Sequence, residues 1–147
     1  MNEFELPAAT HAYLLRAAAS LAEAIGTREV PLRYAQAHVA ALRATAALLA
    51  ARARPVSRPR GSQQRNAWVL LAEVAPEFAE WARFFSAGAA KRAAAEAGSL
   101  RAVTEREADD LVRDADRFLA LVERSLGLAP HLPRPWPEHS LPHAVAG

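Results

Sequence analysis

The sequence has no cysteine and only one lysine, Lys91, among its 147 residues. Without cysteine the chain cannot form disulfides, thiolate metal sites or a cysteine nucleophile. No apolar run approaches the roughly 18 residues that a membrane-spanning helix needs, and the N-terminal residues lack the basic segment of a secretory signal. We therefore expect a cytoplasmic protein that makes no contact with a membrane.

A large excess of one charge is also missing. The 18 basic and 16 acidic side chains leave a net charge of +2. Long-range attraction to nucleic acid depends on net charge and its clustering, so the composition as a whole gives only a weak indication of nucleic-acid binding. Apolar residues make up 52% of the chain, and the length suits one domain with a sizeable core.

Residues with branched β-carbons are sparse, and no stretch alternates between apolar and polar side chains as a strand does. Alanine, the best helix former, is the commonest residue. The sequence predicts an all-α fold, an up-and-down bundle of four long helices plus a short extra helix within residues 1–127. Residues 128–147 are expected to form a proline-rich tail, which Trp136 could dock on the bundle. The helices are expected over residues 7–25, 31–53, 67–75, 76–97 and 104–126.

Spacing along the predicted helices indicates which faces are buried. In the last helix, Thr104 and Glu107 predict a capping box, and Gly127 is expected to end the helix. Gly88 lacks a side chain and would allow another helix to approach closely. In the second helix a heptad-like seam, typical of antiparallel bundles, runs through Leu32, Ala35, Val39, Leu42, Ala46 and Leu49. The last helix should bury Leu111, Val112, Ala115, Phe118, Leu119 and Val122. The aromatic side chains expected in the core are Trp68, Phe78, Trp81, Phe84 and Phe85.

Arg33 and His38 form the first group that could carry chemistry. A histidine titrates near neutral pH and an arginine stays charged, so the pair could act on a phosphodiester as acid/base and charge stabiliser. In an unbroken helix, however, five residues place the two side chains roughly 140° apart. Tyr34, a further candidate contact to nucleic acid or a nucleotide, stands four residues before His38 and shares a face with it. The alternative is that Arg33 and His38 pack on the helix surface or at the rim of the bundle.

Further basic side chains could contact phosphate in RNA, DNA or a nucleotide, because arginine forks match phosphate oxygens. Lys91 and Arg92 follow the small residues around Gly88 and could contact phosphate near a close helix crossing. The other candidates lie in a proline-punctuated segment and could equally be a solvated surface loop. They are Arg54, Arg58, Arg60 and Arg65.

Acidic side chains offer no metal site. Glu73, Glu77 and Glu80 flank the break at Pro76, but the Glu-x-x-His partner of a bundle metal site is missing. We predict neither a metal nor another cofactor. The acidic residues of the last helix are expected on a solvated face, with Asp109 paired to Arg113 four residues on.

Three segments together resemble the actinobacterial SAV-type branch of the HEPN superfamily over about residues 10–126. The first runs from Arg33 as RYAQAHVAALRATAALLA, the second from Val74 as VAPEFAEWARFFSAGAAKR, and the third from Val103 as VTEREADDL. The middle segment is the most specific. The resemblance implies a four- to five-helix bundle that is often dimeric, so we expect a homodimer.

Many HEPN domains are metal-independent ribonucleases of toxin–antitoxin and defence systems, and others only bind nucleotides, nucleic acids or proteins. Their catalytic signature, R-x4-6-H, usually stands near the start of the last core helix, where residues 101–116 contain no histidine. The match within the domain, Arg33 with His38, lies in the second helix instead. We therefore expect a non-catalytic domain that binds nucleic acid, a nucleotide or a protein in a bacterial stress, defence or repair context. The alternatives are a ribonuclease using Arg33 and His38, and a structural adaptor acting through its tail.

Overall fold

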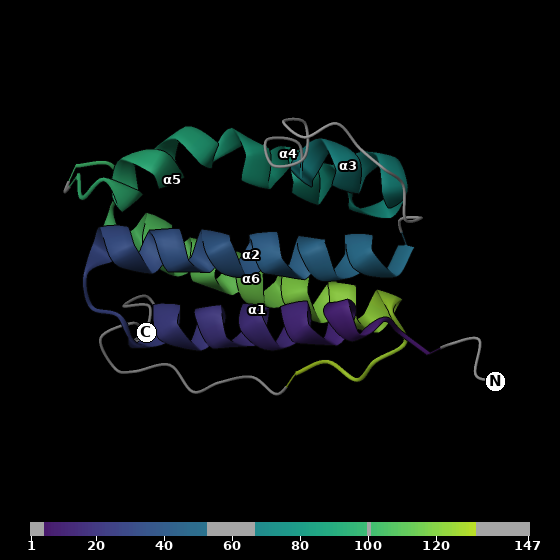
Figure 1. Ribbon diagram of the computed structural model, residues 1–147. Helices are drawn as coiled ribbons and strands as arrows, with labels where there is room; N and C mark the ends of the chain where they lie inside the picture. Colours follow the sequence, from purple (N-terminus) through teal and green to yellow (C-terminus); the bar gives the residue numbers. More distant parts are fainter. Residues whose placement is uncertain (1–4, 53–66, 100, 132–147) are drawn as a thin grey trace, which may run out of the picture.

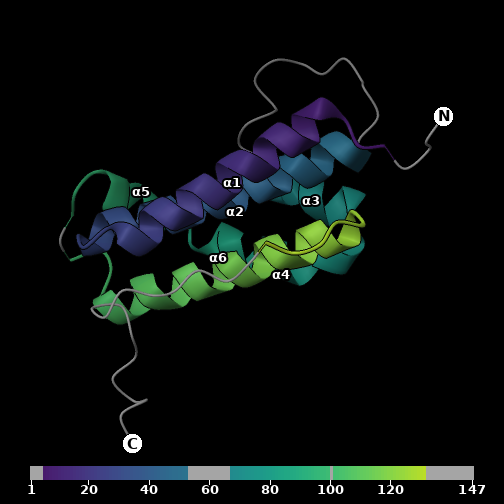
Figure 2. The same ribbon diagram turned by 90° about the horizontal axis from the view of Figure 1, so that it is seen from below.

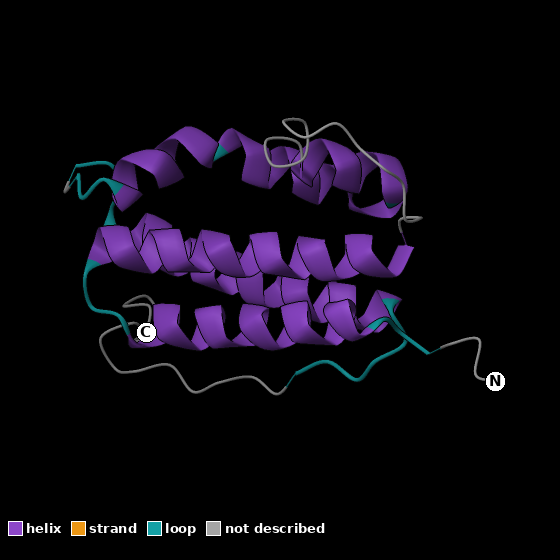
Figure 3. Ribbon diagram, in the orientation of Figure 1, coloured by secondary structure: helices purple, strands orange, loops and turns teal. Residues whose placement is uncertain are grey.

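The computed structural model describes residues 5–52, 67–99 and 101–131, and this part of the chain is helical with no strand (Figure 3). The all-α prediction is confirmed. Within the described residues, no helix has both the length and the apolar character to cross a bilayer. The helices are α1 (Ala8–Gly26), α2 (Val30–Arg52), α3 (Ala67–Val74), the 3-10 helix η1 (Pro76–Phe78), α4 (Ala79–Ala87), α5 (Ala89–Glu96) and α6 (Glu105–Ser125).

Helix α2 lies at the centre of the bundle (Figure 1). It runs antiparallel to α1, to which a short turn joins it, and it also packs on α6, α5 and α3. Helices α4 and α5 follow one another along the side of α2 opposite α1 (Figure 1), and α3 packs alongside α4. The view from below shows α6 lying alongside the α1–α2 pair (Figure 2). The fold is thus a bundle of three long helices whose fourth side is built from short helices.

The predicted seam of α2 is wrong, because the helix turns its alanines inward. Leu32 is 44% exposed, and Val39, Leu42, Ala46 and Leu49 are only half-buried; of the predicted seam Ala35 alone is buried. Since α2 has neighbours on several sides, small side chains let these helices approach closely. Leu32, Val39, Leu42 and Leu49 consequently lie on the outer side of α2, whereas Leu48 is buried. The buried face contains Tyr34, Ala37, His38, Ala41, Ala44, Thr45 and Leu48.

The predicted helix over residues 76–97 is divided in the structure. It begins as η1 after the break at Pro76, continues as α4, and is interrupted at Gly88 before α5. Tyr34 from α2 occupies the space beside Gly88, where an added Cβ would lie 3.0 Å from its hydroxyl oxygen. Gly88 therefore does permit the close approach that its lack of a side chain predicts.

The predicted cap, end and buried face of α6 are confirmed. Thr104 and Glu107 form the capping box, and Gly127 has a positive φ of 80° just beyond the helix, a conformation that glycine adopts without strain. All six apolar residues expected on the inner face of α6 are buried. Phe118 from this face contacts the rings of Phe78, Trp81 and Phe85.

The aromatic core is smaller than expected. Phe78 and Phe85 are buried, while Trp68 and Trp81 are half-buried and packed against the core. Phe84 departs from the prediction, because 47% of it is exposed. The helix turn carries the side chain of Phe84 past the core-facing Phe85, which leaves one large apolar ring at the surface.

Candidate functional site

Arg33 is a buried cation that joins the α1–α2 turn to α6. Its side chain is 1% exposed and lies 2.7 Å from the Asp109 carboxylate. The guanidinium also donates to the carbonyl oxygens of Thr27, at 2.9 Å, and Arg28, at 3.0 Å. Arg33 thus holds the turn that sets α2 beside α1, and its donors point to three partners within the protein.

Asp109 does not lie on a solvated face as the sequence suggested. Its side chain is only 13% exposed because it reaches Arg33, while Arg113 pairs with Asp110 at 3.2 Å. Burial raises the pKa of the Asp109 carboxyl, and the Arg33 and Arg113 charges oppose that shift. A nearly buried ion pair of this kind favours one arrangement of helices more than it adds net stability.

His38 is a buried neutral histidine. Its Nε2 lies 3.1 Å from the carbonyl oxygen of Phe85. Since a carbonyl only accepts, Nε2 carries the proton and Nδ1 presents a lone pair, for which the described residues provide no partner. Burial is the largest influence on the pKa of His38 and lowers it. The ring edge contacts Trp68 and Phe85.

Arg33 and His38 therefore serve different parts of the molecule. Arg33 contacts the α1–α2 turn and α6, whereas His38 contacts α3 and α4. Their five-residue spacing on an unbroken helix places the two side chains roughly 140° apart around the helix axis. Among the described residues, His38 lines a pocket that Arg33 does not line.

His38 instead shares a pocket with two other residues that the sequence singled out, Tyr34 and Lys91. This pocket of about 240 Å³ lies where α2, α4, α5 and α6 meet. Tyr34 and His38 come from one face of α2, and Lys91 comes from α5. The remaining lining residues are Phe84, Phe85, Ala87, Gly88 and Leu111.

The walls of this Tyr34–His38–Lys91 pocket are mostly apolar, and the three residues that name it supply its polar groups. The Lys91 ammonium lies 2.6 Å from the Glu107 carboxylate; this contact raises the pKa of Lys91 and lowers that of Glu107. Burial raises the pKa of Tyr34, which Lys91 partly offsets. A pocket with aromatic walls, a fixed ammonium, a phenol and a histidine suits a ring that carries an anionic group.

The other predicted contacts stand apart from the pocket or outside the described residues. Arg92 pairs with Glu96 at 3.5 Å, does not line the pocket, and acts on His38 through its charge. No group of three or more His, Asp or Glu side chains in the described ranges could hold a metal ion. Arg54, Arg58, Arg60, Arg65 and Trp136 lie outside the part of the chain that the structure describes.

Some residues that line the pocket or pair with Lys91 were expected in other roles. Phe84 and Phe85 were expected in the core, and Glu107 only in a cap. One signal was available: Phe84, Gly88 and Lys91 stand at spacings of four and three, which place them on one side of a helical segment. Leu111 gave no signal, because the sequence does not show which helices meet.

The fold and the pocket define the class: an all-helical bundle domain with a small ligand-sized pocket between its helices. The sequence model of the SAV_6107-like HEPN family matches residues 22–123. The chain belongs to this family, as its sequence segments suggested. Searches of the curated proteins and of the solved structures found no significant match.

Proposed function

We propose that this HEPN domain binds, without cleaving it, a nucleotide unit that is free or part of an RNA or DNA strand. The resemblance implies a bacterial stress, defence or repair context. One observation carries the proposal: the Tyr34–His38–Lys91 pocket gathers aromatic walls and a cation at one place. Its volume lies below the roughly 300–1,000 Å³ of pockets for drug-sized ligands, so it suits one ring with the remainder outside.

The contacts of the two signature-like residues favour binding over catalysis. A metal-independent ribonuclease needs a general base within hydrogen-bond reach of its substrate and a cation beside the phosphate. His38 already holds its proton against the Phe85 carbonyl, and Arg33 already donates to three partners. Lys91, whose side chain is 39% exposed, is the accessible cation.

Lys91 supplies the contact to the phosphate. As an ammonium it acts as a point charge with three donors, and Glu107 occupies only part of its surroundings. Glu107 must compete with a bound phosphate for Lys91, since it lies 2.6 Å away. The affinity for phosphate-bearing ligands should therefore respond in opposite directions to removal of Lys91 and to neutralisation of Glu107.

The test is a calorimetric titration of the full chain with nucleoside monophosphates and with the matching nucleosides. We expect Lys91→Gln to weaken binding of the monophosphates about tenfold, the value of one hydrogen bond to a charged group, and to leave nucleoside binding unchanged. Glu107→Gln should tighten monophosphate binding. It is a matched control, because glutamine preserves the capping box with Thr104. Equal affinities of all three proteins for the monophosphates would reject the proposal.

A second assay separates binding from cleavage. Purified protein is incubated with several RNAs in the presence of chelator, beside folded Arg33→Ala and His38→Ala variants. The proposal requires that the RNA stay intact. Cleavage that persists in chelator and disappears in both variants would establish the ribonuclease alternative, with the two residues meeting across a dimer.

The outer face of α2 supports a homodimer as the protein contact. Leu32, Val39, Leu42 and Leu49 form an apolar outer stripe that is exposed or half-buried, which is the usual property of a protein interface. We expect sedimentation to show a dimer that Leu42→Glu dissociates without unfolding. Leu15→Glu, at a 73% exposed leucine of α1, is the matched control and should leave the dimer intact.

A further inference from the structure

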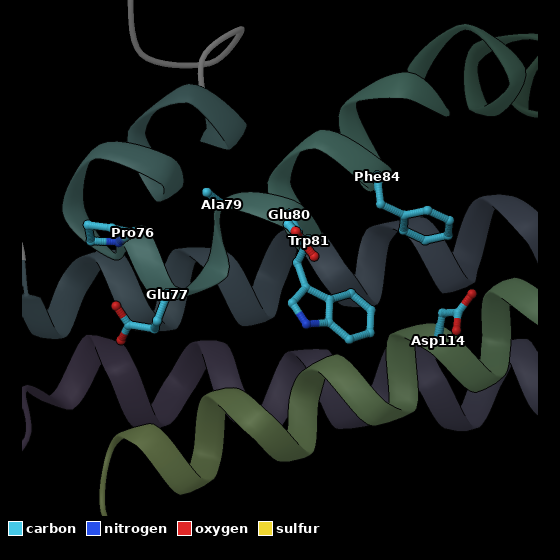
Figure 4. A pocket seen from close by; sticks show the side chains of 7 residues that line it. All are labelled: Pro76, Glu77, Ala79, Glu80, Trp81, Phe84 and Asp114. Carbon is cyan, nitrogen blue, oxygen red and sulfur yellow. The ribbon is translucent and has the colours of Figure 1, made fainter.

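A second hollow lies on the side of the bundle where η1 and α4 meet α6. This acidic–aromatic groove has a volume of about 610 Å³. In Figure 4 the Trp81 indole projects between α4 and α6, with Glu77 at one end and Asp114 at the other. The residues that line the groove are Pro76, Glu77, Ala79, Glu80, Trp81, Phe84 and Asp114.

The groove carries negative charge in a chain whose net charge is positive. Three of its lining side chains are carboxylates and none is basic. Arg52 pairs with Glu77 at 2.7 Å, while Glu80 makes no ion pair with the described residues. Asp114 lies 3.6 Å from Arg117; burial raises the pKa of its carboxyl, and the Arg117 and Arg113 charges oppose that shift. Glu80 therefore keeps most of its capacity to accept hydrogen bonds, and Asp114 keeps part of it.

The aromatic side chains add a specific geometry to this charge. Trp81 is fixed from behind by ring contacts with Phe85 and Phe118, and Phe84 packs edge-on to Trp81 at a centroid distance of 6.3 Å. Phe84 is one of the few large apolar side chains left exposed. A cation that stacks on such rings while carboxylates accept its hydrogen bonds gains both a cation–π contact and charge-assisted bonds.

We propose that the acidic–aromatic groove binds an arginine side chain presented by a partner protein. The carboxylates of the groove favour a cation, and the Trp81 and Phe84 rings favour a planar cation that can stack on them. A guanidinium stacks on an aromatic face and donates in its plane to carboxylates, whereas a lysine ammonium is a compact and strongly hydrated charge that does neither as well. The groove is separate from the Tyr34–His38–Lys91 pocket and shares only Phe84 with it.

The test uses three synthetic peptides of equal length, containing arginine, lysine or citrulline, and the full-length protein in calorimetry. Citrulline keeps the planar shape of arginine and removes its charge. We expect saturable binding of the arginine peptide, weaker binding of the lysine peptide and at least a tenfold loss with citrulline. The affinity for arginine should fall with added salt.

Variants then locate the site. Glu80→Gln with Asp114→Asn should weaken binding of the arginine peptide at least tenfold, and Phe84→Ala should weaken it severalfold. Glu23→Gln removes an exposed carboxylate of α1 and should change nothing. Equal affinity for the citrulline peptide, or equal losses in the Glu23 and Glu80/Asp114 variants, would overturn the proposal, because the peptide would then recognise no particular carboxylates.

Discussion

Replacing Arg33 by alanine tests most directly what this residue does. Arg33 is almost completely buried and is bonded to Asp109 and to the carbonyls of Thr27 and Arg28. Its removal leaves a carboxylate and two carbonyl oxygens without their donors. Breaking a buried ion pair from one side costs about 3–5 kcal/mol. Asp109 keeps some access to water, so the expected loss of unfolding free energy lies near the lower limit, about 3 kcal/mol.

Urea unfolding followed by circular dichroism measures this loss. In thermal unfolding followed by the same signal, we expect the Tm of a chain of this size to fall by about 6–12 °C. Arg28→Ala is the matched control, since Arg28 lies exposed in the same turn, and it should change stability by less than about 0.5 kcal/mol. An Arg33→Ala protein as stable as the wild type would refute the structural role.

A double replacement separates the two components of that loss. In Arg33→Met with Asp109→Leu, neither charge remains buried without a partner, and the apolar side chains fill the space. Such exchanges are often neutral or stabilising, so the double variant should recover most of the stability lost in Arg33→Ala. A double variant as unstable as Arg33→Ala would indicate that the bonds to the two turn carbonyls carry the stability instead.

Three further predictions concern single side chains. Burial lowers the pKa of His38 in the folded protein below its ordinary 6.5, so the unfolded chain binds a proton that the folded chain does not. The free energy of unfolding should therefore decrease as pH falls below about 6.5. Urea titrations at pH 5–7 should show a weaker pH dependence of stability in His38→Gln. The pKa of His131, which bridges Asp116 and Glu123, is raised to about 9. The stability that the protonated His131 adds to the folded protein is complete below about pH 6.5 and is lost as the pH rises to about 9. His131→Gln should therefore destabilise the protein at about pH 6 and not at about pH 9.5. Gly88→Ala, whose Cβ would lie 3.0 Å from the Tyr34 hydroxyl oxygen, should lower the free energy of unfolding in urea by about 1 kcal/mol, and adding Tyr34→Phe should restore that stability.

The helices of this chain follow largely from local rules and could be located from the sequence. Capping by Thr104 and Gly127 and the break at Pro76 depend on backbone chemistry within a few residues, whereas the interruption at Gly88 within the expected helix over residues 76–97 was not predicted. Which face of α2 is buried does not depend on such local chemistry. Periodicity marks the leucine stripe as the buried one, because larger apolar side chains release more free energy on burial. In a central helix with several neighbours, the alanine face allows closer approach, and Leu32, Leu42 and Leu49 remain exposed or half-buried while Leu48 is buried.

The candidate site could be predicted less well from the sequence, because its main contacts join residues that are far apart in the chain. Arg33 and Asp109 are 76 positions apart, and His38 and Phe85 are 47 apart. A short motif such as Arg33 with His38 suggests one joint role, yet on a helix a five-residue spacing sends the two side chains to different neighbours. The four-residue spacing of Tyr34 and His38 was the better guide, since it predicts a shared face. Lys91 of α5 lies at the same face, and this meeting of four helices makes binding at the pocket a stronger hypothesis than cleavage by the pair.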